Sequence, residues 1–178
     1  ATQATKNMLH FNIFADRVPD FKADWMRIPC EAAKEKCQAV ANELSVPGWS
    51  SGTNHQEAIM SALKKSKQLV SAYDEGSCLN HIVVITDGNA TMGEQNPLRL
   101  SNEIENFLNS EEGRHDVIIH CLVVGIDVNV RVPMGLCGPT GGVVASAPKP
   151  DQLSENMAKI FGPIHEAYSP MIATVQWT

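Results

Sequence analysis

Long apolar runs are missing from this chain of 178 residues. No stretch approaches the roughly 20 consecutive apolar residues that a bilayer-spanning helix needs. The opening ATQATKNML lacks both the charged start and the apolar stretch of a signal peptide. Basic residues are also in the minority, with 14 lysines and arginines against 20 aspartates and glutamates and a net charge of -6. This balance argues against a nucleic-acid-binding protein, which needs a concentrated basic patch, and is compatible with a divalent cation or a basic partner surface.

The signatures of several enzyme classes are absent as well. No Gly-x-Ser-x-Gly elbow occurs, so an α/β-hydrolase would lack its central residue. The stretch GPTGGV at 138–143 fits neither of the usual phosphate-binding glycine patterns. The histidines show no metal-ligand spacing, and we expect His81 and His120 to be hydrogen-bonded core or rim residues. The chain is therefore not expected to be an enzyme.

Cysteine is present in an odd number, five, so the thiols cannot all pair within the chain. Cys30 and Cys37 lie too far apart along an expected helix to form a disulfide. Cys121 stands in an apolar stretch and is predicted to be a buried thiol. Cys137, in a glycine-rich stretch predicted to be a loop, is a candidate reactive thiol, but an inert cysteine is favoured because no base lies near it in sequence. Reduced cysteines are expected.

Strand-like and helix-like stretches alternate along the chain. Short apolar runs predict strands, and apolar residues spaced three and four apart predict helices. The expected strands are 8–15, 81–86, 116–127 and 141–147, and the expected helices are 30–44, 55–73, 97–110 and 151–164, the last with Asp151 as its N-cap. Strands at 81–86 and 116–127 that are apolar on both faces are typical of a sheet covered by helices on both sides. We therefore predict an α/β fold with a doubly wound, mostly parallel sheet.

Two loops carry the residues that could do chemistry, because ligands bind such folds at the carboxyl ends of the strands. The stretch ITDGNATMGE follows a buried strand and carries Asp87, and SSGTN precedes a helix and carries Thr53. Carboxylate and hydroxyl oxygens suit magnesium, manganese or calcium. Two plainer interpretations stay open. Asp87 could cap its own turn, with Gly88 at positive φ, and Thr53 or Asn54 could be a helix N-cap.

The order of the motifs resembles a von Willebrand factor A domain. The segments that carry the resemblance are FNIFADRVPDF, GWSSGTNHQEAI, HIVVITDGNATMGE, VVGIDVNV and TGG. The sequences of TDGNATMGE, GIDVNV and the tail YSPMIATVQWT are most similar to those of family members found beside inter-α-trypsin-inhibitor-type domains. The resemblance covers nearly the whole chain. It implies a von Willebrand factor A-like domain at 1–165 and, at 166–178, an exit strand towards a further domain or a partner.

The resemblance also implies a metal-ion-dependent adhesion site. In that family an Asp-x-Ser-x-Ser motif, a threonine and an aspartate surround Mg²⁺, Mn²⁺ or Ca²⁺, and a partner carboxylate completes the coordination. Thr53 and Asp87 match the threonine and the aspartate. The residues expected to shape the metal loops are Ser51, Gly52 and Gly88, and those expected to contact the partner are Trp49, Asn54 and Asn89.

The Asp-x-Ser-x-Ser motif, which should end the family's first and central strand, does not occur in the sequence. Thr53 and Asp87 alone would hold a cation weakly, because such ions take about six oxygen ligands. A sheet without that strand would expose two unpaired edges, so we expect another chain or a further segment to complete it. The implied function is protein–protein interaction or adhesion. The alternative is a metal-independent structural or scaffolding subunit, and the compartment stays open.

Overall fold

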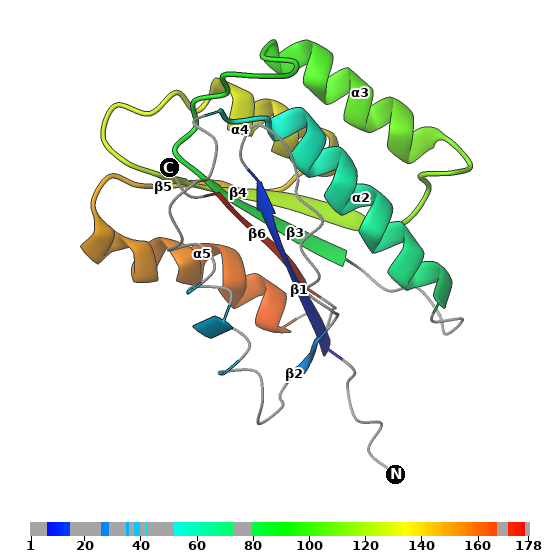
Figure 1. The fold of residues 1–178 in the computed structure, drawn as a ribbon, viewed down its shortest axis with the longest axis horizontal. Helices are drawn as coiled ribbons and strands as arrows, with labels where there is room; N and C mark the ends of the chain where they lie inside the picture. The colour runs from blue at the N-terminus through cyan, green and yellow to red at the C-terminus, as the bar shows by residue number, and fades with distance from the viewer. Residues whose placement is uncertain are drawn as a thin grey trace.

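The computed structural model describes residues 7–14, 26–28, 35, 38–39, 42, 52–72, 80–166 and 171–176. They contain one open six-stranded sheet of order β2-β1-β6-β3-β4-β5 (Figure 1). The strands are β1 (Asn7–Phe14), β2 (Met26–Ile28), β3 (Asn80–Thr86), β4 (Val117–Val124), β5 (Val144–Ala147) and β6 (Met171–Gln176). Every neighbouring pair is parallel except β1 and β2. The predicted mostly parallel α/β fold is confirmed, and it is consistent with a von Willebrand factor A or Rossmann-like architecture.

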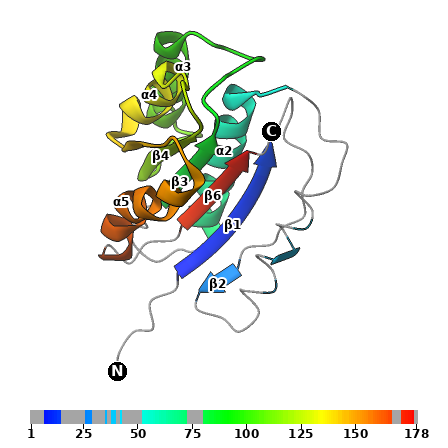
Figure 2. The same cartoon turned by 90° about the vertical axis from the view of Figure 1, so that its left-hand side faces the viewer.

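Helices cover both faces of the sheet (Figure 2). On one face lie α2 (His55–Ala72), α3 (Pro97–Asn109) and the short α4 (Arg131–Cys137), and on the other lies α5 (Leu153–Glu166). The apolar spacing of 55–73, 97–110 and 151–164 predicted the three long helices. None of the described helices is long and apolar enough to cross a membrane.

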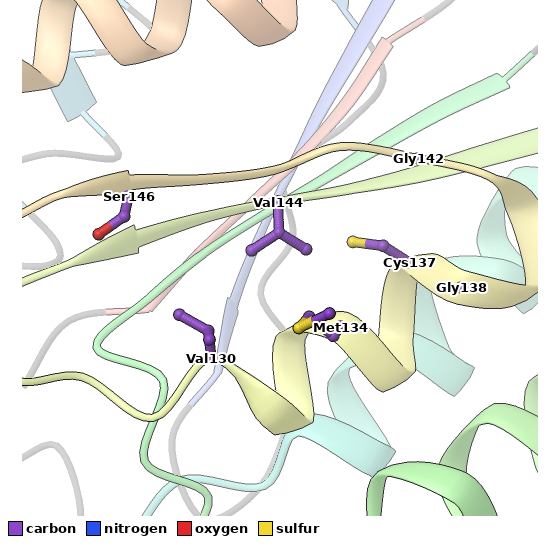
Figure 3. A pocket seen from close by; sticks show the side chains of 7 residues that line it. All are labelled: Val130, Met134, Cys137, Gly138, Gly142, Val144 and Ser146. Atoms are coloured by element: carbon purple, nitrogen blue, oxygen red, sulfur yellow. The ribbon is translucent and has the colours of Figure 1, made fainter.

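Helix α4 was not predicted, because Pro133 and Gly135 lie within it. Proline is tolerated at this place because the first turn of a helix needs no backbone N–H from it. Gly135 is required by packing, since a Cβ there would lie 2.5 Å from the carbonyl oxygen of Pro97. Cys137 is therefore the last residue of a helix rather than part of a loop (Figure 3). The prediction of Asp151 as an N-cap was also wrong, because Asp151 lies in a 3₁₀ turn (Pro150–Gln152) and α5 begins at Leu153.

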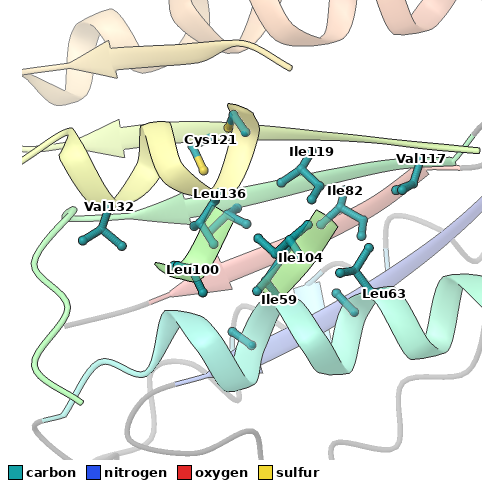
Figure 4. Packing of buried hydrophobic residues seen from close by; sticks show 14 residues of the cluster. Ile59, Leu63, Ile82, Leu100, Ile104, Val117, Ile119, Cys121, Val132 and Leu136 are labelled. Atoms are coloured by element: carbon teal, nitrogen blue, oxygen red, sulfur yellow. The ribbon is translucent and has the colours of Figure 1, made fainter. Parts of the chain in front are cut away.

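Two apolar clusters hold the layers together. The larger one fills the space between the sheet and α2, α3 and α4 (Figure 4), and its fully buried large members are Ile59, Leu63, Ile82, Leu100, Ile104, Ile119 and Leu136. The smaller cluster joins the other face to α5 and contains Val83, Leu122, Ala145, Ala147 and Ile160. Each large aliphatic side chain buried in this way contributes about 1.5–3 kcal/mol.

The segment 171–176 lies at the centre of the sheet rather than leaving it. Leu9 to Phe14 of β1 pair with β6 on one side, and His81 to Ile85 of β3 pair with it on the other. The physical reason is backbone hydrogen bonding, since β1 and β3 would otherwise each present an unpaired row of N–H and C=O groups. The gap that the resemblance assigned to another chain or a further segment is filled here by the chain's own residues.

Three further sequence predictions have structural outcomes. In the expected helix 30–44 the four described residues are helical, and the Gln38 amide donates to Asn42 Oδ1 at 3.1 Å. His81 and His120 are buried and hydrogen-bonded as predicted, with Nδ1 of His81 3.1 Å from Nε2 of His120. Cys121 is a buried free thiol. The predictions for Cys30, Cys37, Trp49 and Ser51 fall outside the described residues.

Candidate functional site

The two loops predicted to meet at the carboxyl ends of the strands are hydrogen-bonded to each other. The Thr53 N–H donates to Thr91 Oγ1 at 2.7 Å. The Thr53 carbonyl accepts from the N–H groups of Thr91 and Met92, both at 3.0 Å. Thr53 itself is 3% exposed. The SGTN and TDGNATMG motifs therefore form one structural unit at the end of β3.

Asn54 is the N-cap of α2, which decides between the two capping residues left open by the sequence. Its Oδ1 accepts from the Glu57 N–H at 3.1 Å, and its Nδ2 donates to Glu57 Oε2 at 3.2 Å. This reciprocal arrangement satisfies one of the backbone donors that a helix start leaves unpaired. Asn54 thus has a structural role, independent of the partner contact expected of it.

Replacing Asn54 with alanine should lower the free energy of unfolding by about 1 kcal/mol, because the cap is lost. Thermal or urea unfolding would measure the change. Asn89→Ala is the matched control, since Asn89 is exposed and contributes its backbone N–H, which alanine keeps. Equal stability of the two variants would contradict the capping role.

Beneath the loops His55 bonds to the end of β3. His55 Nε2 lies 2.7 Å from Thr86 Oγ1, which also accepts from the Gly88 N–H at 3.1 Å. The Thr86 hydroxyl therefore links His55 to the turn that follows β3. Burial lowers the pKa of His55 from 6.5 to about 4, although the nearby Asp87 carboxylate acts in the opposite direction. His55 is therefore neutral at neutral pH.

Asp87 is half-buried at the turn that follows β3. Its Oδ1 accepts from the Asn89 N–H at 3.1 Å, so Asp87 does cap its own turn. Gly88 has φ of 82°, and a Cβ there would lie 2.8 Å from the carbonyl oxygen of Asn129. The positive φ at Gly88 is as predicted from the sequence. The turn is thereby held against the loop that carries Asn129.

Two residues of this site, His55 and Thr91, were not predicted from the sequence. His55 directly follows the N-cap of α2, yet nothing in its spacing indicated that it would bond to Thr86, 31 positions away in sequence. Thr91 supplies the hydroxyl that holds Thr53. Its position in NATMG was the available signal, since hydroxyl side chains commonly bond to backbone in turns.

The oxygen donors at the site suit a hard divalent cation in kind but are few in number. Thr53 can offer a hydroxyl and Asp87 a carboxylate, the ligand types that Mg²⁺, Mn²⁺ and Ca²⁺ prefer. Gly52 and Asn54 lie beside them in the same loop. No group of three or more histidine, cysteine, aspartate or glutamate side chains able to hold a metal occurs in the described part of the chain. The donors named here would leave most of the coordination sphere to water or to a partner.

The open parallel sheet, with polar loops at the carboxyl ends of its strands, places the chain among doubly wound α/β domains. The sequence is similar to that of inter-alpha-trypsin inhibitor, heavy chain 4, of Mus musculus, with 25% identity over 154 residues. The aligned region covers 85% of this chain and 15% of the length of the mouse protein. No protein-family model matches the chain.

Proposed function

We propose that the chain is a von Willebrand factor A-like module for protein–protein interaction and not an enzyme. The observation that carries this proposal is that the Thr53 loop is hydrogen-bonded to the 87–92 turn at the carboxyl end of β3. Polar loops at that edge are where doubly wound domains recognise ligands. The similarity to an inter-alpha-trypsin inhibitor heavy chain supports the same class of module.

Thr53 and Asp87 would hold a divalent cation, Mg²⁺ in the first instance, at this edge. When bound, the cation supplies a positive centre to which a carboxylate of the partner can bind. Neighbouring residues of the protein would hold these two side chains in position for the cation. Thr91 fixes the Thr53 backbone, Asn89 fixes one Asp87 oxygen, and neutral His55 adds no positive charge beside the cation.

Asp87→Asn should weaken binding of Mn²⁺ or Mg²⁺ roughly tenfold or more, because affinity at such sites depends on the number of charged ligands. The asparagine side chain can still accept from the Asn89 N–H, so the turn and the fold should persist. Isothermal titration calorimetry with MnCl₂ measures the affinity, and circular dichroism checks the fold. Asn89→Ala, which leaves the carboxylate in place, is the matched control. Equal affinities of Asp87→Asn and the unmodified chain would refute the site.

A metal-independent structural or scaffolding subunit is the second candidate. The observation in its favour is that large apolar side chains lie on the surface: Leu98 is 74% exposed and Ile126 is 73% exposed. Exposed apolar residues of this size support association through buried area rather than through an ion. The same titration distinguishes the two candidates, because absence of any cation binding by the unmodified chain would favour the scaffold.

A further inference from the structure

A pocket opens between α4 and the edge strand β5 (Figure 3). It has a volume of about 440 Å³, and its walls include the side chains of Val130, Met134, Cys137 and Val144. The Cys137 sulfur points into the pocket, towards Val144. None of the described residues that line the pocket is charged, so the pocket suits a small neutral molecule.

A second thiol belongs to Cys121 in β4, which lies in the same buried apolar cluster as Cys137. The Cys137 thiol donates to the carbonyl oxygen of Val143 at 3.8 Å, and the Cys121 N–H donates to the same oxygen at 2.9 Å. The two cysteines thus contact the same carbonyl oxygen, and both belong to the larger apolar cluster. Both cysteines are reduced in the structure. The chain therefore holds a pair of adjacent thiols of which one borders the pocket.

We propose that Cys121 and Cys137 are an oxidant-sensitive dithiol that hydrogen peroxide converts to a disulfide. The Cys137 sulfur attacks one oxygen of peroxide and becomes a sulfenic acid, and the other oxygen leaves as water with the proton that the Cys137 thiol gives up. The Cys121 sulfur then attacks the Cys137 sulfur, and its proton leaves with the hydroxyl group as a second water. Two thiols are thereby oxidised by two electrons, and one peroxide is reduced to two waters.

The geometry sets the order of the two steps. Both cysteines are buried, at 2% exposed for Cys137 and 0% for Cys121, but Cys137 lines the pocket and Cys121 does not, so Cys137 reacts first. Burial and the neighbouring Cys137 raise the pKa of the Cys121 thiol, which keeps it protonated and unreactive towards oxidants from outside. Cys121 is thus placed to resolve the sulfenic acid.

The disulfide would tie the end of α4 to β4 and close a loop that contains Asn129. A Cβ added to Gly88 would lie only 2.8 Å from the carbonyl oxygen of Asn129, so this loop packs on the Asp87 turn. Oxidation at the pocket would therefore restrain the loop that supports that turn. The dithiol itself does not depend on the proposed cation site.

The test begins with a chain in which Cys30, Cys37 and Cys78 are replaced by serine, which leaves only the proposed pair. The protein is treated with hydrogen peroxide, alkylated, digested without reductant and mapped by mass spectrometry. We expect a peptide pair linked through Cys121 and Cys137, which dithiothreitol separates. The unmodified chain is treated in parallel, so that the result does not depend on the folding of the triple variant.

Two single variants in the same background test the order. With Cys121→Ser, dimedone should label Cys137 as a sulfenic acid that persists because nothing resolves it. With Cys137→Ser, Cys121 should remain alkylatable after peroxide. The proposal is overturned if peroxide leaves both thiols alkylatable in the unmodified chain, or if Cys121 is oxidised in the absence of Cys137.

Discussion

Gly142→Ala should lower the free energy of unfolding by about 4 kcal/mol, a loss at the upper end of what single substitutions cause. A Cβ at Gly142 would lie 1.7 Å from the carbonyl oxygen of Ile119 and 2.6 Å from its carbonyl carbon. Both atoms belong to the backbone of β4, so no side-chain rotation can relieve the clash. Moving the loop away would break the bond from the Cys121 N–H to Val143 O, 2.9 Å long, and the bond from the Ile119 N–H to Thr140 Oγ1, also 2.9 Å.

Urea unfolding of purified protein measures this effect, and failure to accumulate as soluble protein would be its extreme form. Gly138→Ala is the matched control in the same stretch. Gly138 has a helical φ of -51°, and the nearest atom to an added Cβ is Ser101 Oγ at 3.8 Å. Alanine there should change stability by about 1 kcal/mol or less. If Gly142→Ala were no worse than Gly138→Ala, the close approach of this loop to β4 would be wrong.

Acidification from pH 7 to pH 5 should remove about 2 kcal/mol of stability through His55 alone. The folded protein holds the pKa of His55 at about 4, against 6.5 when the side chain is unperturbed. Between these values the unfolded chain binds a proton that the folded chain does not, so acid favours unfolding. The stabilisation is complete above about pH 6.5 and declines as the pH falls towards 4. His120 adds to the loss, because burial and neighbouring His81 lower its pKa to about 4.

A series of urea titrations between pH 8 and pH 4 would record the decline. His55→Gln isolates one contribution, since glutamine can still bond to Thr86 but does not titrate in this range. The variant should be less stable at pH 7, yet its stability should fall by about 2 kcal/mol less than that of the unmodified chain between pH 7 and pH 5. Parallel pH curves for the two proteins would show that His55 does not carry the effect.

Periodicity in the sequence predicted the elements whose apolar pattern is set by the sheet and its covering helices. The runs at 81–86 and 116–124 are apolar on both faces because helices pack on both sides of β3 and β4. Helix α4 could not be predicted in this way, since Pro133 and Gly135 are tolerated only because of their places in the first turn and against α3. The segment 166–178 was expected to be an exit strand, but its neighbours were not predicted, because strand order depends on contacts far apart in sequence.

The location of the candidate site was predictable from the fold class, since the Thr53 and Asp87 loops both belong to the edge where parallel strands end. Their hydrogen bonding through Thr91 confirms that they meet. The support beneath them was not predictable, because the bond from His55 to Thr86 joins two elements whose packing is seen only in three dimensions. Binding of a cation by Thr53 and Asp87 stays a prediction.

The central place of β6 has a consequence for how the chain folds. β3, β4 and β5 succeed one another along the sequence and can associate early, but among the described strands β1 is joined to them only through β6. The two parts of the sheet therefore join only when Leu9 of β1 pairs with Met171 of β6. Pairing across such sequence separation loses loop-closure entropy before contacts form, which slows folding. Until β6 pairs, the facing edges of β1 and β3 have unpaired backbone groups that another strand could pair with. We therefore expect strand exchange between chains to occur at the middle of the sheet.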